Sequence, residues 1–488
     1  MRAKIRNVYR YLAYSLLKVR ETKLDIIIER SYRKVFKLKT KTFQIMKTFR
    51  LLIVSLLSVA SVATATAQKR MDTGRGGNPT VYLISVQEND NTCGCSPSMI
   101  RDNVIGDYLD TYRGGFQQVR NPQFIFATKN NKFSMALGGY INLRTSYDFM
   151  GAVDNIDFVP YYIPMATTYA NRQRIMMDAT TSRLYMKTIV NSSSLGRIVA
   201  FVDMDFRGGD EFSYTPRLRS AYVKVGGFTV GRDVTTFCDL LAGPQTVDFR
   251  GPNAYNFNFN TMIRFEQPFL RDHWTFALAA EMPRVNATYG ENFSRISQRV
   301  PDGVVYLQYA WGKGRRNHLR ASGVVRDMYL HNNLSGENTT RVGWGTQFSG
   351  HIAFNSFLDI FFNGVYGEGI SPYIQDLAGA PYDLMADPAN PGSIKTMPMW
   401  GWQAAGRLSF VPGVFWVSGG YSNVNIENDD NLMTPDQYKK GQYIFANMFC
   451  NISSNCTLAV EYLRGYRENF SELQNTANRI SLMVQYNF

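Results

Sequence analysis

The last ten residues of the chain alternate between apolar and mostly polar side chains. One phase holds Ile480, Leu482, Val484, Tyr486 and Phe488, and the other holds Arg479, Ser481, Met483, Gln485 and Asn487. A period of two places these sets on opposite faces of a β-strand. About ten residues is also the length with which a tilted strand crosses a bilayer. The segment therefore predicts one strand of a transmembrane β-barrel.

Similar alternating segments recur along the chain. We count sixteen, at residues 133–149, 180–191, 197–207, 216–225, 227–233, 259–268, 273–282, 303–312, 318–328, 343–354, 357–367, 399–411, 414–423, 441–450, 456–466 and 477–488. Short and long connections alternate between them, which is typical of outer-membrane barrels and not of a soluble β-sandwich. We predict an all-β fold: a transmembrane antiparallel barrel of 16 strands, with short periplasmic turns, long extracellular loops and both termini in the periplasm.

The front of the chain has the three parts of a signal peptide. Residues 46–50 are basic, residues 51–63 form an apolar run, and residues 65–67 read Ala-Thr-Ala, a cleavage site before Gln68. The run is too short for a transmembrane helix. We predict a signal peptide at 46–67, and residues 1–45 are interpreted as a mis-assigned leader. Residues 68–125 would then be a periplasmic N-terminal extension, and residues 126–488 the barrel.

Removal of residues 1–67 changes the net charge of the protein. Residues 1–67 carry 15 of the 53 Lys and Arg residues and 3 of the 39 acids, which leaves 38 bases and 36 acids in the mature chain. The basic excess is therefore no evidence for a nucleic-acid partner. The mean hydropathy is slightly negative, as expected for strands that give half of their side chains to water. Sixteen strands leave an aqueous lumen, so a channel is the default function.

The inward phase of several strands is charged. We predict a pore-lining set in which Arg or Lys faces acidic partners: Arg183, Lys187, Asp203, Asp205, Arg207, Arg219, Arg232, Arg264, Glu266 and Glu281. The phase of Arg232 is ambiguous. A charged ring in a narrow pore selects solutes by sign, and guanidinium groups bind carboxylates or phosphates through two hydrogen bonds. Alternatively, these side chains pair with one another and only satisfy a polar wall.

Four short motifs resemble the DcaP-like trimeric porins of Gram-negative outer membranes. They begin at Phe201, Leu218, Gly231 and Ile263 and read FVDMDFRG, LRSAYVKV, GRDVTTF and IRFEQPF. The junction at residues 67–68 and the Asn- and Tyr-rich strands are similar to porins of the Bacteroidetes. The resemblance implies a sixteen-stranded homotrimer in the outer membrane that passes small hydrophilic, often anionic solutes such as dicarboxylates. Residues 68–125 lack heptads, so the coiled coil of some members is not expected here.

Residues 233–258 connect the fifth and sixth strands, where general porins fold a loop into the barrel. Asp239, Asp248 and Arg250 could oppose the arginines of the wall, with Gly-Pro turns at 243–244 and 251–252. We predict that this segment is a constriction loop. The alternative is an ordinary external loop.

The remaining candidate sites are few. Cys450 and Cys456 bracket a tight turn, so a disulfide is a candidate unless the side chains point to opposite faces. The four histidines form no spaced metal motif, and we expect no metal, no cofactor and no enzymatic activity. Phe488 resembles the terminal signal that the barrel-assembly machinery reads. We predict a porin that is surrounded by outer-membrane lipids. Small hydrophilic, anionic solutes would diffuse passively through its channel. The alternative is a non-conducting structural or adhesive barrel.

Overall fold

The computed structural model describes residues 82–86, 97–120, 122, 124–128, 131–210, 213–312, 314 and 316–488. The predicted leader and signal peptide lie outside these residues. The strands are β1 (Tyr82–Val86), β2 (Phe124–Thr128), β3 (Phe133–Phe149), β4 (Gln173–Asp178), β5 (Arg183–Ser192), β6 (Gly196–Asp205), β7 (Arg217–Val225), β8 (Phe228–Val234), β9 (Phe259–Phe269), β10 (Trp274–Glu281), β11 (Ala287–Thr288), β12 (Phe293–Arg295), β13 (Asp302–Trp311), β14 (Asn317–Asn332), β15 (Glu337–Ala353), β16 (Leu358–Glu368), β17 (Leu384–Ala386), β18 (Ile394–Thr396), β19 (Pro398–Val411), β20 (Phe415–Ile426), β21 (Tyr438–Asn451), β22 (Cys456–Asn469) and β23 (Gln474–Asn487). The helices are α2 (Pro97–Asp110) and the 3₁₀ turns η1 (Pro160–Tyr162), η2 (Leu240–Ala242), η4 (Ser371–Tyr373) and η5 (Gln375–Leu377). No helix among the described residues is long and apolar enough to cross a membrane.

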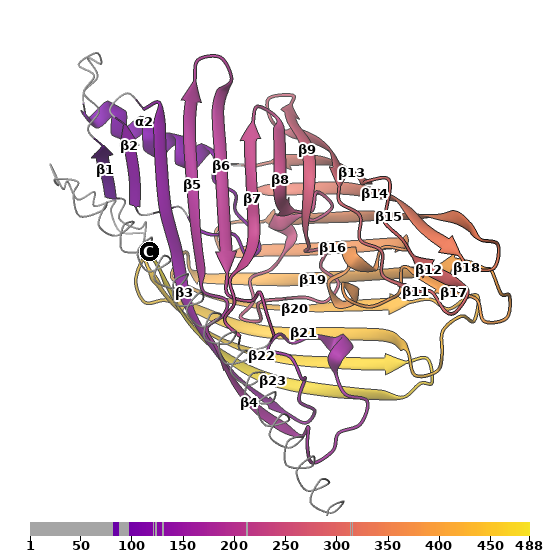
Figure 1. Ribbon diagram of the computed structural model, residues 1–488. Coiled ribbons are helices and arrows are strands. Elements are labelled where there is room, and N and C mark those ends of the chain that lie inside the picture. Colours follow the sequence, from indigo (N-terminus) through magenta and orange to yellow (C-terminus); the bar gives the residue numbers. More distant parts are fainter. Residues whose placement is uncertain are drawn as a thin grey trace, which may run out of the picture. The chain divides into compact units, whose positions relative to one another are not determined.

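Sixteen of the described strands form a closed barrel. Strands β3, β5–β10, β13–β16 and β19–β23 pair with their neighbours in chain order, and every pair is antiparallel. The ring closes where β23 pairs with β3 (Figure 1). Phe488 extends this seam, because its backbone N–H donates to Gly139 O at 3.0 Å and Gly139 N–H donates to Phe488 O at 3.1 Å. Each of the sixteen predicted segments coincides with one barrel strand, and the predicted fold class is confirmed.

In the last strand, β23, the apolar and polar phases lie on the two predicted faces. Ile480, Leu482 and Val484 are exposed on the outer surface of the barrel, whereas Arg479 and Ser481 are buried on the inner side. One uniform apolar phase is what a surrounding bilayer requires, since it offers no hydrogen bonds to polar side chains.

The N-terminal part was interpreted as a periplasmic extension that could be partly ordered inside or beneath the lumen, and the structure places α2 against the inner wall of the barrel. Val104 and Tyr108 of α2 pack on Ala136, Ile189 and Val199 of β3, β5 and β6. Strand β2 pairs with the start of β3, and β1 pairs in parallel with β2. The sequence did not predict these elements, because a short helix that depends on tertiary packing has little local signal.

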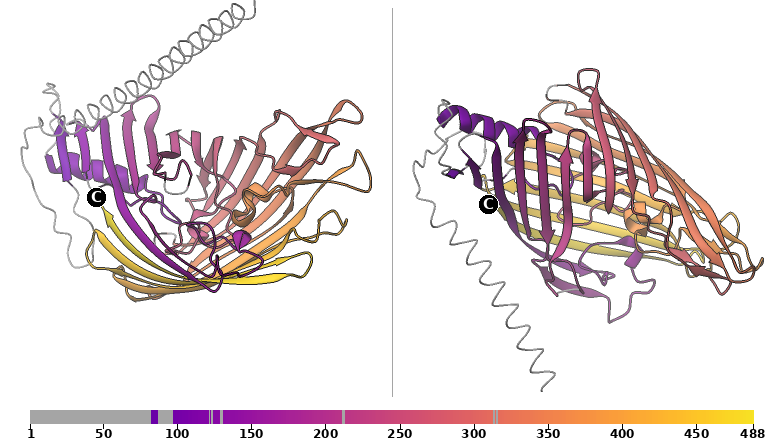
Figure 2. Two further views of the ribbon diagram at one scale, coloured as in Figure 1. Left: turned by 60° about the horizontal axis from the view of Figure 1, so that its bottom comes forward. Right: turned by 45° about the horizontal axis from the view of Figure 1, so that its top comes forward.

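Three long loops fold into the barrel rather than away from it (Figure 2). Loop 150–172 buries Phe158 and Ile163 against inward side chains of β16, β19 and β21–β23. Loop 234–258 and loop 369–397 contribute Phe237, Tyr373 and Leu377 to the largest apolar cluster. All three belong to the end of the barrel with long connections, which we call the long-loop end. The opposite end is called the short-turn end. The loops fill much of the lumen and leave a charged zone beside β3–β8.

Candidate constriction of the lumen

The inner wall of β3–β8 is built from arginine–aspartate pairs. Arg183 Nε lies 2.8 Å from Asp203 Oδ1, and Arg219 Nη1 lies 2.9 Å from Asp205 Oδ2. Period-two geometry explains these pairs, because residues of one phase on neighbouring strands face the same side of the sheet. The sequence prediction that these four residues share the inward face is consistent with their positions.

An irregularity in β7 strengthens this wall. The register between β6 and β7 shifts at Asp203 and Met204, so that Arg219 and Ser220 are both buried although they are consecutive. The shift brings a second arginine to the same carboxylate: Arg217 Nη2 lies 2.6 Å from Asp205 Oδ2. Arg217 was missed in the sequence analysis, although it shares the phase of Arg219 in the strand.

The carboxylates of this wall lie beneath the guanidinium groups. The side chain of Asp205 is 0% exposed, whereas that of its partner Arg217 is 39% exposed. Arg207, at 15% exposure, covers Asp157 of loop 150–172, at 7%, with an Nη2–Oδ2 distance of 2.7 Å. In both pairs the guanidinium group is the more exposed partner, and the carboxylate is the more buried one. Arg219 itself is only 1% exposed and is therefore a structural member of the wall.

Loop 234–258 is fixed to the opposite wall by buried polar contacts. Asp239 accepts hydrogen bonds from His318 Nε2 at 2.8 Å and Ser349 Oγ at 2.7 Å, and it caps η2 through Leu241 N–H at 3.2 Å. Burial alone would raise the pKa of Asp239, but the charge and hydrogen bond of His318 hold it below its usual value. At the start of the loop, Glu281 of β10 accepts from Thr235 Oγ1 at 2.7 Å.

A second anchor holds the middle of this loop. Glu461 on the inner face of β22 accepts the backbone N–H groups of Val247 at 2.9 Å and Asp248 at 2.7 Å. The Asp248 carboxyl accepts from Phe158 N–H at 3.1 Å and Tyr443 OH at 3.1 Å. These contacts join loop 234–258 to loop 150–172 and to the wall. The segment folds inward, and its role as a constriction loop stays a prediction.

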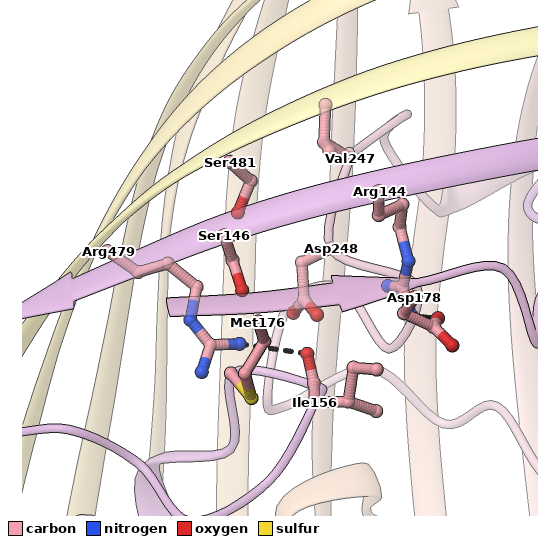
Figure 3. Close-up of a pocket in the computed structure, with 9 residues that line it drawn as sticks. All are labelled: Arg144, Ser146, Ile156, Met176, Asp178, Val247, Asp248, Arg479 and Ser481. Carbon is pink, nitrogen blue, oxygen red and sulfur yellow. Dashed lines mark hydrogen bonds and ion pairs between the residues drawn. The ribbon is translucent and has the colours of Figure 1, made fainter. Parts of the chain in front are cut away.

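Asp248 also borders a small space of about 10 Å³, enough for one water molecule. Figure 3 shows its carboxylate between Arg144 of β3 and Arg479 of β23, and Arg479 Nη1 donates to Ile156 O at 2.9 Å. Burial and the nearby negative charge of Asp157 raise the pKa of Asp248 to about 6. Asp157 has the opposite shift: burial would raise its pKa, but Arg207 and Arg144 keep it below the usual value.

Phe249 is the contact between loop 234–258 and the charged wall. Its ring centre lies 5.0 Å from Arg219 Cζ, 5.2 Å from Arg207 Cζ and 5.6 Å from Arg144 Cζ. Cations are attracted to the face of an aromatic ring within about 6 Å. One phenyl ring therefore ties three guanidinium groups of three separate segments to the loop, and this cluster defines the candidate constriction.

The other predicted residues lie at the edges of this arrangement. Arg264 pairs with Asp233 at 2.7 Å, and Glu266 accepts from Tyr306 OH at 2.7 Å. Lys187 is covered by the chain after α2, and its Nζ donates to Thr111 O at 2.9 Å. The predicted partner of the wall, Arg250, donates instead to Gln375 O of loop 369–397.

Two sequence predictions do not fit this arrangement. Arg232 lies opposite Thr261 and in phase with the exposed Phe228 and Val230, which places it on the outer face of β8 and away from the pore-lining set. Cys450 and Cys456 are both free thiols. They share the outer face, but Cys450 pairs with Leu458 in the sheet, so the two cysteines are not directly opposite.

A cavity of about 230 Å³ lies between loop 234–258, the segment after α2 and the inner faces of β9, β13 and β14. Its lining includes Arg113 from the segment after α2, Arg264 of β9 and Arg320 of β14, together with Cys238 and Tyr306. The guanidinium of Arg320 lies over the Tyr306 ring, 3.4 Å from its centre. The segment after α2 was not among the predicted site residues. Arg144, Phe249 and Glu461 were not predicted either. The alternation of β3 and β22 could have assigned Arg144 and Glu461 to the inner face, but it says nothing about Phe249 in a loop.

Comparison with known proteins gives a consistent result. The profile of the DcaP outer membrane protein family matches residues 123–366, half of the chain. The outer membrane channel DcaP of Acinetobacter baumannii is similar, with a TM-score of 0.64, 18% identity, and coverage of 74% of this chain and 99% of that chain. OmpT of Vibrio cholerae and OmpF of Salmonella typhi each have a TM-score of 0.47, with 12% and 11% identity, over 74% of this chain and 99% of theirs. A comparison with curated protein sequences found no match.

The closed sixteen-stranded barrel with inward-folded loops is the fold of an outer-membrane porin channel. The chain belongs to the DcaP outer membrane protein family. The resemblance noted from the four sequence motifs is thereby confirmed. The family and the fold are those of channels rather than enzymes.

Proposed function

We propose that the protein lets small hydrophilic, anionic solutes diffuse passively across the outer membrane through a constriction between the β3–β8 wall and loop 234–258. The observation that carries this proposal is the burial of Asp205 and Asp157 beneath the more exposed Arg217 and Arg207. A solute passing this zone meets guanidinium N–H groups, which bind carboxylates and phosphates well. The field of a narrow pore with low-dielectric walls then favours anions.

The cellular setting belongs to the same proposal. We infer that the signal peptide at 46–67 exports a mature chain starting at Gln68, and that the barrel assembles as a homotrimer in a Gram-negative bacterium of the Bacteroidetes type. The short-turn end and both termini would face the periplasm. The position of Phe488 at the closing seam supports its role as the signal for the barrel-assembly machinery.

The test is the reversal potential of the purified mature protein in a planar bilayer under a salt gradient. We expect single-channel conductance steps and an anion-selective reversal potential. The Arg207→Ala/Arg217→Ala variant should lower the anion-to-cation permeability ratio severalfold, because it uncovers Asp157 and Asp205. The matched control is Arg299→Ala, which removes an exposed arginine that pairs with Asp327 in the long-loop region and should leave the ratio unchanged. Cation selectivity of the unmodified protein would contradict the proposal.

A non-conducting structural or adhesive barrel is the second candidate. It is favoured by the buried apolar cluster that loops 234–258 and 369–397 form inside the lumen, with Phe237, Ile374 and Leu377 each 0% exposed. The same bilayer experiment separates the two candidates. A correctly folded barrel that produces no conductance would support the plugged barrel and reject the porin.

A further inference from the structure

The chain leaves α2 and runs through the lumen before it enters β2. We call residues 111–120 the lumen strap. Arg113 Nη1 pairs with Asp233 Oδ2 of β8 at 2.5 Å, and Arg120 Nη1 donates to Ser454 O in the turn between β21 and β22 at 3.0 Å. The strap is therefore held at one end by β8 of the charged wall and at the other by the short turn between β21 and β22.

Gln117 is the polar centre of the strap. Its side-chain oxygen accepts from Arg219 Nη2 at 2.5 Å, its backbone oxygen accepts from Arg183, and its amide donates to Phe249 O. This single residue thus occupies two arginines of the wall and the tip of the constriction loop. Gln117 has a φ of 54°, in the left-handed region. Such a backbone is costly for a residue with a side chain and persists only while its contacts hold it.

Phe116 is the apolar contact of the strap with the constriction loop. It is 5% exposed, and its ring packs edge-on against Tyr255 and Phe257, with centres 5.0 and 5.3 Å apart. Its backbone N–H donates to Leu240 O at 2.7 Å. Two glycines of loop 234–258 make room for the side chain. A Cβ on Gly243 would lie 2.6 Å from Phe116 Cβ, and one on Gly251 would lie 2.8 Å from Phe116 Cζ.

We propose that the lumen strap is a releasable barrier within the channel, closed by insertion of Phe116 between Gly243 and Gly251. This inference rests on the proposed channel function. Most of the other strap contacts are polar, and water can replace them. The loops of the opposite wall, in contrast, are buried in large apolar clusters. Release of the strap removes one side of the 230 Å³ cavity, which Tyr112, Arg113 and Gly114 help to line. It also frees Arg183 and Arg219 from Gln117.

Cys238 offers a native reporter of this movement. It belongs to the same apolar cluster as Phe116, lines the cavity, and is 3% exposed. Burial raises the pKa of this thiol to about 12, so it reacts slowly while the strap is seated. The experiment uses the full mature chain with Cys93, Cys95, Cys450 and Cys456 changed to Ser. It measures the labelling rate of Cys238 by a charged methanethiosulfonate, together with the single-channel conductance.

Phe116→Ala should speed labelling by at least about tenfold, because truncating a buried phenyl group weakens its site by more than the ~1.4 kcal/mol that a factor of ten represents. The unitary conductance should rise as well. Gly243→Ala should have the same effects from the other side of the contact, because its Cβ would displace Phe116. The control is Phe293→Ala, which removes a buried ring of β12 that lies in a different cluster, without residues of loop 234–258.

The outcomes separate the barrier from the channel. Faster labelling and higher conductance in both test variants, with neither in Phe293→Ala, would support the barrier. Wild-type labelling and conductance in both folded variants would overturn it and leave the channel intact. Faster labelling without conductance in any variant would reject the channel, and with it the barrier as a device of transport.

Discussion

The two halves of the inner wall use their inward positions differently. In β3–β8 these positions carry paired charges such as Arg183 and Asp203, and in β14–β22 many are apolar, such as Val365, Val424 and Phe445. Loops 150–172, 234–258 and 369–397 pack on the apolar half. The charged positions of β3–β8 face Phe249, Asp157 and the lumen strap, whereas the apolar Ala136, Ile189 and Val199 of these strands are covered by α2. The inward composition of each half therefore matches what covers it.

This difference indicates separate roles. Burial of apolar surface stabilises a fold by roughly 25 cal/mol per Å², so the β14–β22 wall can hold its loops permanently. Buried ion pairs give little net stability because of their desolvation cost. The β3–β8 wall is better explained as a surface for solutes and for exchangeable contacts. This distinction between the two walls is wrong if the charges of the β3–β8 wall prove to be the main source of the barrel's stability.

The largest effect should follow from breaking one ion pair of the charged wall. Arg183→Gln leaves Asp203, which is 0% exposed, without its bidentate partner. We expect a loss of about 3 kcal/mol in unfolding free energy, because breaking a buried ion pair is costly and Arg219 Nε, at 3.7 Å, is a more distant partner for Asp203. Urea unfolding of the barrel in lipid vesicles measures it.

The matched control replaces both partners, as Arg183→Met with Asp203→Leu. Because no charge is left unpaired, this variant should recover most of the stability while it alters the selectivity of the channel. If the double variant is as unstable as the single one, the charged wall supports the fold in its own right, and the distinction between the two halves is wrong.

The sequence predicted the sixteen strands because the bilayer imposes one uniform apolar phase. It predicted the arginines and acids of β5–β7 for the same reason, since the opposite phase must be polar unless it is covered. The inward-folded loops carry a weaker signal. In β21, Tyr443, Phe445 and Phe449 make the inward phase apolar as well, which indicates that the inner side of this strand is covered.

The identity of what covers a wall could not be predicted. Glu461 binds the backbone of loop 234–258 from more than two hundred residues away, and no local pattern specifies such a contact. The lumen strap was hidden for a related reason. Gln117 and Phe116 are ordinary residues in a segment without periodicity, and their roles arise only from the residues that the barrel brings around them.

A smaller effect should come from pH. The pKa of Asp248 is raised to about 6 by burial and Asp157, above its ordinary value near 4 in an unfolded chain. The folded state therefore binds a proton that the unfolded state releases between these values, so stability falls as pH rises from 4 to 6. The cost above pH 6 should be about 1–3 kcal/mol. We expect the unfolding midpoint to rise when the pH is lowered from 7 to 5.

Asp248→Asn supplies the control for this pH effect. Asn cannot titrate and retains one oxygen for the N–H of Phe158, so the part of the pH dependence due to Asp248 should disappear. Unfolding midpoints of both proteins at pH 5, 6 and 7 give the comparison. An unchanged pH profile in the variant would assign the effect to another buried acid.

The smallest effect on ion selectivity should come from replacing Arg232. This variant compares the inner and outer faces of a single strand, β8. Arg232 and Asp233 are neighbours in β8, but Asp233 is buried on the inner face while Arg232 donates to Leu218 O on the outer one. Only inward charges meet a solute, so Arg232→Ala should leave the anion-to-cation permeability ratio unchanged. The Arg207→Ala/Arg217→Ala variant, which removes inward arginines, should lower it. Arg232→Ala could instead shift the reversal potential as much as Arg207→Ala/Arg217→Ala does. Ion selectivity would then not depend on which face of the strand carries the charge.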